Sequence, residues 1–554
     1  MSKPRIAFAV LSVLTALAIW VVPYRFATEP GGGYYNFSCY SDECFYAAHF
    51  APLIEKTDDL NVVNGMSEPS FTPQYYLEML IRKFVTITGI APITFFWIWR
   101  VVFPVVLGAG LLFLAATTVR REDEPWHRQP LVLFAAAAAW PLFYCLYDVL
   151  LPTFPLRYWL DRVPTNLEFL LTVLLFALFV RLLRKPDLNR ALAVVAALAL
   201  IAYARPYAIL GGGVAVGIAV LWLTVTRFLT LRITLISVAV FVLLLLPLVL
   251  QMYQNGQSPE YKQWSQRYFT GVSAYQIHPR WYVHAGVAVA LAIAAWRLAG
   301  PWRIFAVALS LTAASIPFTS GLPAYRAQML HVYDRWAWYV LPAVTVAGLL
   351  VLGRASESWQ ALSDSRRIRN WTLGLSALSL LASGILAVRN FTYNFDADQI
   401  SDHLVLKGDT VSLPAYAWVK ANTDPGALFL VDDGLDWSEI SKDAQLKSYV
   451  AMFTWDRAEF FLLMARRRCV FTERLWVNSI KLADMADCYN LQRGTFGMPM
   501  PVSDYVKALK HLHPDYVYWR RPAPIPRGYG TQLQKLAKVV YSDSTCEIWA
   551  LHYE

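Results

Sequence analysis

Long apolar runs alternate with short polar segments along the first 388 residues of this chain. A membrane-spanning helix needs about 20 consecutive apolar residues, and by that measure the pattern predicts about eleven transmembrane helices. They are expected at residues 5–23, 93–118, 131–150, 166–183, 190–204, 207–226, 232–252, 281–296, 303–320, 337–352 and 371–388. One helix over 190–226 would be about 55 Å long, nearly twice the hydrocarbon thickness, so we expect a hairpin at Arg205-Pro206.

The pattern changes after residue 388, where charged residues become frequent and helix-like and strand-like segments alternate. Residues 414–426 and 502–515 have the spacing of helices, whereas 427–433, 515–519 and 546–553 have the apolar and aromatic character of strands. The sequence therefore predicts two domains. A transmembrane catalytic domain covers 1–388, with a first outer loop at 24–92, and a soluble α/β domain covers 389–554.

Composition supports a membrane protein over a soluble one. The chain is 57% hydrophobic and only 16% charged, whereas about 25% charged residues is usual in soluble proteins. The net charge of +10 does not indicate nucleic acid, because Lys and Arg are spread over the short gaps between apolar runs. The first run follows basic residues, as in a signal peptide, but no small-residue cleavage motif follows it, so we expect a retained span.

Basic residues also predict an orientation. With the N-terminus in the cytoplasm, the predicted inner loops are denser in Lys and Arg than the outer segments, as the positive-inside rule requires. An odd number of spans then places the C-terminal domain in the periplasm or outside the cell. Residues 69–89 of the first outer loop have helix-like apolar spacing next to Arg82 and Lys83, which suggests a helix along the membrane interface.

Acidic residues gather at the predicted outer ends of the apolar runs, where Asp42, Asp148, Asp161 and Asp334 all fall. Many-span proteins are often transporters, but a transporter usually buries acids or a broken helix near the bilayer midplane, and the sequence shows no clear sign of either. A carboxylate at the outer surface suits a general base that takes a proton from a hydroxyl as it attacks an activated sugar.

Arginines at the same ends suggest a site for a phosphate. The leaving group in transfer from a polyprenyl phosphate gains negative charge, which Arg, Lys or His stabilises. We expect Arg205 and Arg335, with Arg326 and His331, to bind the donor phosphate. Snorkelling to the interface is the alternative for the arginines, and an interfacial hydrogen bond is the alternative for His331. Arg100 starts deeper in the second predicted span, and we expect it on the acceptor side of the site or behind the residues that bind substrate.

Two acids flank the predicted outer loop between the third and fourth spans. Asp148 and Asp161 could orient the acceptor or a divalent cation, or could pair locally with Arg157 and Arg162. The need for a cation stays open, because one or two acids in a loop can act as a base without binding metal.

The first outer loop, the Arg-Pro turn at 204–210 and the basic-aromatic-proline segment at 333–344 together resemble the glycosyltransferase C superfamily. That superfamily includes protein mannosyltransferases, lipid A aminoarabinose transferases, oligosaccharyltransferase catalytic subunits and mycobacterial arabinofuranosyltransferases. The resemblance implies that Asp42 is at the position of the catalytic base, with Glu43 as the adjacent acid. The chain lacks a clean DxD motif and the WWD-type motif of oligosaccharyltransferases, so the sugar and the acceptor stay open.

The cysteines suggest two disulfides rather than a metal site, since none shows the spacing of zinc ligands. On the predicted outer face, Cys39 and Cys44 could close a short loop around Asp42, and Cys469 and Cys488 could pair in the tail.

The sequence thus predicts a multi-pass inner or plasma membrane glycosyltransferase. It would transfer a sugar from a polyprenyl-phosphate donor to a glycan, lipid or protein outside the cytoplasm, with inversion and with Asp42 as the base. The alternatives are a transporter or flippase of lipid-linked glycan, and a non-catalytic scaffold whose tail binds a partner.

Overall fold

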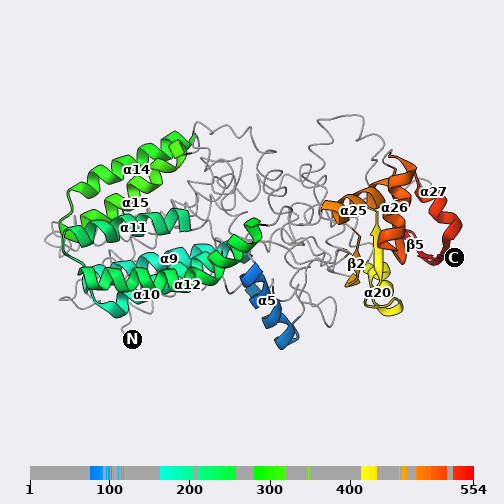
Figure 1. Ribbon diagram of the computed structural model, residues 1–554, viewed down its shortest axis with the longest axis horizontal. Coiled ribbons are helices and arrows are strands. Elements are labelled where there is room, and N and C mark those ends of the chain that lie inside the picture. Colours follow the sequence, from blue (N-terminus) through cyan, green and yellow to red (C-terminus); the bar gives the residue numbers. More distant parts are fainter. Residues whose placement is uncertain are drawn as a thin grey trace, which may run out of the picture. The chain divides into compact units, whose positions relative to one another are not determined.

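The computed structural model describes nine segments of the chain. They cover residues 75–90, 163–204, 209–257, 280–319, 413–432, 465–470, 482–497, 500–520 and 528–553, with isolated positions between 95 and 117 and at 347 and 461. The chain divides into two compact units. We call the part that contains α9 to α15 the helical unit and the part that contains α20 to β5 the α/β unit (Figure 1). The predicted domain boundary at 388/389 lies outside the described segments.

Helices make up the helical unit, and each apolar run predicted within its described residues forms one. They are α9 (Val163–Arg184), α10 (Leu188–Ala204), α11 (Ile209–Val225), α12 (Leu231–Gln257), α14 (Arg280–Trp296) and α15 (Gly300–Thr319). The predicted interruption near Arg205-Pro206 is confirmed, since α10 ends at Ala204 and α11 begins at Ile209. Among these helices α9 packs on α10, α14 packs on α15, and α11 lies against α9 and α15.

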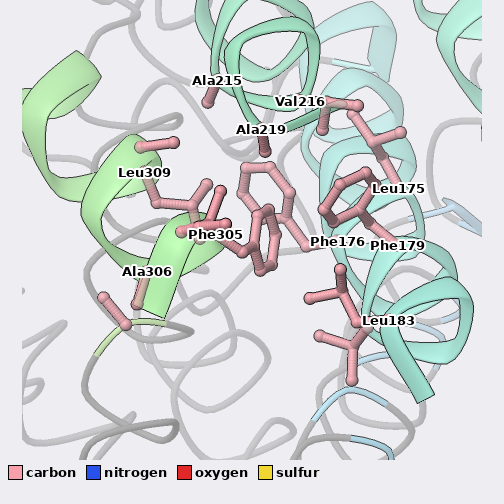
Figure 2. Close-up of a cluster of buried hydrophobic side chains, with 14 of the residues drawn as sticks. Leu175, Phe176, Phe179, Leu183, Ala215, Val216, Ala219, Phe305, Ala306 and Leu309 are labelled. Atoms are coloured by element: carbon pink, nitrogen blue, oxygen red, sulfur yellow. The ribbon is translucent and has the colours of Figure 1, made fainter. Parts of the chain in front are cut away.

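The core of the helical unit is built from phenylalanines that pack on small residues. Phe176 and Phe179 of α9 meet Phe305 of α15, with ring centroids 6.1 Å and 4.5 Å apart. Figure 2 shows Ala215 and Ala219 of α11 lining the same cluster. All five side chains are fully buried, so the alanines let α11 approach closely while the aromatic rings fill the space between the three helices.

The helix α12 differs from its neighbours because most of its residues are exposed, although Ile233 and Phe241 pack against the core. Its segment Leu231–Gln254 has 24 residues and a mean hydropathy of 3.0. Only 6% of the residues in the most apolar 18-residue stretch of this segment are buried. At 1.5 Å per residue it is about 36 Å long, enough to cross the hydrocarbon core. Leu235, Val242 and Leu243 are each more than half exposed, so this helix presents apolar side chains to its surroundings along its length.

The prediction of about eleven transmembrane helices is wrong. Within the described segments α12 is the one helix long and apolar enough to span a membrane. The other predicted spans there are helices, but α10 and α11 have 17 residues each, which gives about 26 Å, less than the roughly 30 Å of hydrocarbon. Apolar composition indicated burial correctly in these helices, but much of that burial is against other helices of the same unit.

The expected helix in the first outer loop is present as α5 (Tyr75–Thr88). Leu80, Phe84 and Ile87 are 61%, 50% and 84% exposed and, at positions i, i+4 and i+7, they share one face. Val85 faces away from them and is buried.

The α/β unit is built on a five-stranded mixed sheet in the order β2-β1-β3-β5-β4. β1 (Leu428–Val431), β2 (Arg468–Cys469) and β3 (Tyr516–Arg520) are parallel, whereas β5 (Cys546–Leu551) runs antiparallel to β3 and to β4 (Ala537–Ser542). The helices of the unit are α20 (Leu413–Asn422), α25 (Leu482–Thr495), α26 (Val502–Leu512) and α27 (Gly530–Leu533), followed by the 3₁₀ turn η4 (Gln534–Leu536). The helices and strands predicted from the sequence at α20, β1, α26, β3 and β5 are therefore confirmed.

The two faces of the sheet carry different helices. Tyr416 of α20 stacks on Tyr518 of β3, with ring centroids 5.7 Å apart. Trp519, the next residue of β3, meets Phe496 at the end of α25, 4.9 Å away. Successive residues of a strand point to opposite faces, so α20 covers one face of the central strands and α25 covers the other.

Candidate functional site

Nearly all of the site residues predicted from the sequence lie outside the described segments. These are the proposed catalytic acids Asp42 and Glu43, the phosphate-binding candidates Arg205, Arg335, Arg326 and His331, the acceptor-side candidates Asp148, Asp161 and Arg100, and the cysteines Cys39 and Cys44. Their roles stay predictions.

The predicted disulfide between Cys469 and Cys488 is not formed. Cys469 in β2 and Cys488 in α25 are both thiols, buried to 1% and 0% exposure. A buried thiol behaves as a small apolar side chain, which explains both positions by packing. Cys546 is also a buried thiol, and burial followed by the charge of Asp543 raises its pKa to about 11. The thiol of Cys546 is therefore protonated at neutral pH and is a poor nucleophile.

Polar side chains meet at the carboxyl ends of β1 and β3. β2 lies on one side of β1 and β3 on the other, so the chain order reverses between β1 and β3, the kind of place where open α/β sheets bind ligands. Asp432, 4% exposed, directly follows β1 and accepts a hydrogen bond from the backbone N–H of Arg520 at 3.2 Å. The side-chain amide of Gln492 in α25 donates to the carbonyl of Val431.

This edge was missed in the sequence analysis, although a signal for it was present. The run 427–433 was predicted as a buried strand, and the acidic residues at its end, Asp432 and Asp433, would fall at the carboxyl edge of a parallel sheet. Nothing in the local sequence indicated Gln492, which reaches Val431 across 61 residues. The contacts of Asp432 and Gln492 tie α25 and the end of β3 to β1.

A second polar cluster joins α25 to α26. The carboxylate of Asp487, whose side chain is 6% exposed, lies 2.8 Å from Nδ1 of His511 and 3.4 Å from Nζ of Lys507. Residues 507 and 511 are four apart and share one face of α26. His511 is half exposed, so the cluster pins the two helices together at the surface of the unit.

Asp543 organises the turn between β4 and β5. Its carboxylate accepts hydrogen bonds from the hydroxyls of Tyr541 and Thr545 and from the backbone N–H groups of Thr545 and Cys546, at 2.7 to 2.9 Å. Burial opposes the charge, but these hydrogen bonds outweigh it and lower the pKa of Asp543 to about 2. The same environment raises the pKa of Tyr541 to about 12, with burial as the largest cause.

In the helical unit, three short turns lie at the same end. α9 and α10 are joined at 185–187, α11 and α12 at 226–230, and α14 and α15 at 297–299. Phe179, Ala219 and Phe305 pack in one cluster, and each lies slightly less than about two helical turns from one of these connections. The three turns must therefore be at one level, and we call this the basic end.

Exposed cations surround the basic end, in segments that the sequence analysis had predicted to be inner loops. The exposed basic side chains there are Arg181, Lys185, Arg227, Arg232, Arg297 and Arg303. Asp187 is the one acidic residue in the three turns and their flanking helical turns. It accepts a 2.9 Å hydrogen bond from the backbone N–H of Arg190, so it caps α10.

Arg190 makes its own contacts within the same turn. Its guanidinium lies 3.6 Å from Asp187 and donates to the carbonyl oxygens of Arg181 and Lys185 at the end of α9. The acid is thus paired locally, and the exposed cations of the basic end face no other described carboxylate.

Comparison with known proteins does not assign the chain to a family. No protein-family model matches the sequence, and no curated protein matches it.

Proposed function

We propose that this chain is a membrane-bound glycosyltransferase that uses a polyprenyl-phosphate-linked sugar and an acceptor outside the cytoplasm. The structural observation that carries the membrane part of the proposal is α12. Only 6% of the residues in the most apolar stretch of this helix are buried, so most of its apolar surface would be exposed to water, at a cost of about 25 cal/mol per Å². A bilayer removes that cost.

The chemical part of the proposal depends on the acids that follow the first apolar run. Asp42 would accept the proton of the acceptor hydroxyl as its oxygen attacks the anomeric carbon of the donor sugar. The bond from that carbon to the phosphate oxygen then breaks, and polyprenyl phosphate leaves with the electron pair. Arg205 and Arg335, with Arg326 and His331, would stabilise the charge on the leaving phosphate. Direct displacement inverts the configuration at the anomeric carbon.

The proposal is tested with full-length protein in lipid nanodiscs, supplied with polyprenyl-phosphate-linked sugars and extracytoplasmic glycan acceptors. We expect Asp42→Asn to lower turnover by about 10²–10⁴-fold, the usual contribution of a general base, while donor binding stays within a few-fold of wild type. Asp58→Asn is the matched control, because Asp58-Asp59 is a second pair of adjacent acids in the same predicted loop.

Two results would contradict the proposal. One is full turnover in Asp42→Asn, which would remove Asp42 from the chemistry. The other is movement of the lipid-linked sugar across the bilayer, unchanged by Asp42→Asn, with no transfer product from the wild type. That result would identify a flippase.

A further inference from the structure

The basic end concentrates positive charge where three pairs of helices turn. Six exposed cations from α9, the α9–α10 turn, α11–α12 and α14–α15 lie at one level, as the packing of Phe179, Ala219 and Phe305 requires. Arg303 also lies over the ring of Trp296, 5.7 Å from its centroid, across the α14–α15 turn. Among the described residues of these turns the one acid, Asp187, is paired with Arg190, and such an excess of positive charge attracts an anionic partner.

Arg227 lies at a position of the α11–α12 turn where the backbone favours glycine. It is the second residue after α11 and has φ of +60°, the left-handed conformation, which glycine adopts without cost and other residues adopt with strain. The backbone N–H groups of the next two residues, Phe228 and Leu229, both donate hydrogen bonds to the carbonyl oxygen of Leu223. The turn would form more easily with glycine at 227, so Arg227→Gly can remove this cation without straining the backbone.

The basic end adjoins the apolar surface of α12. Leu231, 63% exposed, begins that helix beside Arg232, and exposed apolar side chains continue from there as far as Tyr253. A surface that passes from clustered cations into an apolar helix of membrane-spanning length has the layers of a bilayer leaflet. The cations would lie at the level of anionic headgroups and attract them, and the apolar helix would lie in the hydrocarbon.

We infer that the basic end is a binding surface for the phosphates of anionic phospholipids, with α12 in the adjoining hydrocarbon. The inference depends on the membrane placement in the proposed function and adds the lipid class and the residues that recognise it. Each Lys or Arg near such a surface adds to the attraction, and the attraction decreases as salt increases.

The test uses full-length protein in vesicles of phosphatidylcholine, with or without phosphatidylglycerol. For the wild type we expect phosphatidylglycerol to raise the midpoint of thermal unfolding by a few degrees, and sodium chloride to reduce that rise. The triple variant Arg227→Gln, Arg297→Gln, Arg303→Gln should lose most of the rise. The matched control Lys510→Gln, Lys535→Gln, Lys538→Gln removes three exposed cations of the α/β unit and should keep it.

A second variant separates charge from folding. Arg227→Gly removes one cation at a position whose backbone favours glycine, so it should fold at least as well as wild type and still show a smaller rise. An unreduced rise in both the triple variant and Arg227→Gly would overturn the inference.

Further outcomes separate this inference from the proposed function. Equal midpoints in both kinds of vesicle, with the protein floating in each, would overturn the lipid inference alone. Failure to float with either would overturn the membrane placement itself. An equal rise from inorganic phosphate in phosphatidylcholine vesicles would assign the surface to free phosphate instead of lipid.

Discussion

The hydroxyl of Tyr203 in α10 donates a 2.8 Å hydrogen bond to the carbonyl oxygen of Leu244 in α12. Pro247 lies inside α12 three residues later, and because proline has no N–H and its ring crowds the preceding turn, carbonyls in this turn lose or weaken their helical hydrogen bonds. Tyr203 supplies a donor there, which is how polar side chains of neighbouring helices support proline in membrane helices.

We therefore expect Tyr203→Phe to lower the free energy of unfolding by about 0.5–1.5 kcal/mol, the net value of one such hydrogen bond. Unfolding of the full-length protein in mixed micelles measures the change. Tyr253→Phe in α12 is the control, since that side chain is 65% exposed, and it should leave the stability unchanged. Equal effects of the two substitutions would contradict the assigned role of Tyr203.

Removal of the ring of Phe305 should destabilise the helical unit strongly. Phe305 is fully buried between Phe176 and Phe179, and truncation of a buried phenylalanine costs about 3–5 kcal/mol through lost contacts and a cavity. We expect Phe305→Ala to lower the unfolding midpoint, measured by circular dichroism at 222 nm. Leu311→Ala in the same helix removes a side chain that is half exposed and should have a much smaller effect; a larger one would be contrary to this packing.

The guanidinium of Arg467 closes the end of α20. Its Nε donates to the hydroxyl of Thr423 at 2.9 Å, and Nη2 donates to the carbonyl oxygens of Lys420 and Thr423 at 2.7 Å. Arg467→Met would leave these helix-terminal carbonyls without their donor, at a cost of about 2–3 kcal/mol. Chemical denaturation followed by near-UV circular dichroism measures it. Arg466→Met, at the preceding position, keeps all three bonds and should be close to wild type.

Acid should weaken the β4–β5 turn through Asp543. Its pKa is lowered to about 2 in the folded protein, whereas an unfolded aspartate titrates near 3.9. The unfolded state therefore takes up the proton first, so the stabilisation is complete above about pH 4 and is lost as the pH falls towards 2.

Asp543→Asn should accordingly be less stable than wild type at neutral pH, with the difference shrinking between about pH 4 and pH 2. Thermal unfolding at a series of pH values gives the two curves. Curves that stay parallel through this range would show that the turn does not depend on the charge of Asp543.

Much of the local structure was predictable because periodicity is a property of neighbouring residues. The apolar runs gave the positions of the helices from α9 to α15, and the break near residue 205 followed from length alone. The aromatic and apolar runs gave β1, β3 and β5. By contrast β2 has two residues and α25 no apolar face strong enough to recognise, and both owe their conformation to contacts with the rest of the α/β unit.

The sequence by itself determined where most of the described helices and the strands β1, β3 and β5 form, and it placed basic residues in the turns between helices. Only the tertiary structure decided which apolar surfaces are buried against protein and which stay exposed, as the contrast between Phe305 and the exposed length of α12 shows. It also decided that Cys469 and Cys488 remain thiols and that three distant turns form one basic end. Burial and proximity depend on residues far apart in the chain, and the hydropathy of a single segment carries no information about its neighbours in space.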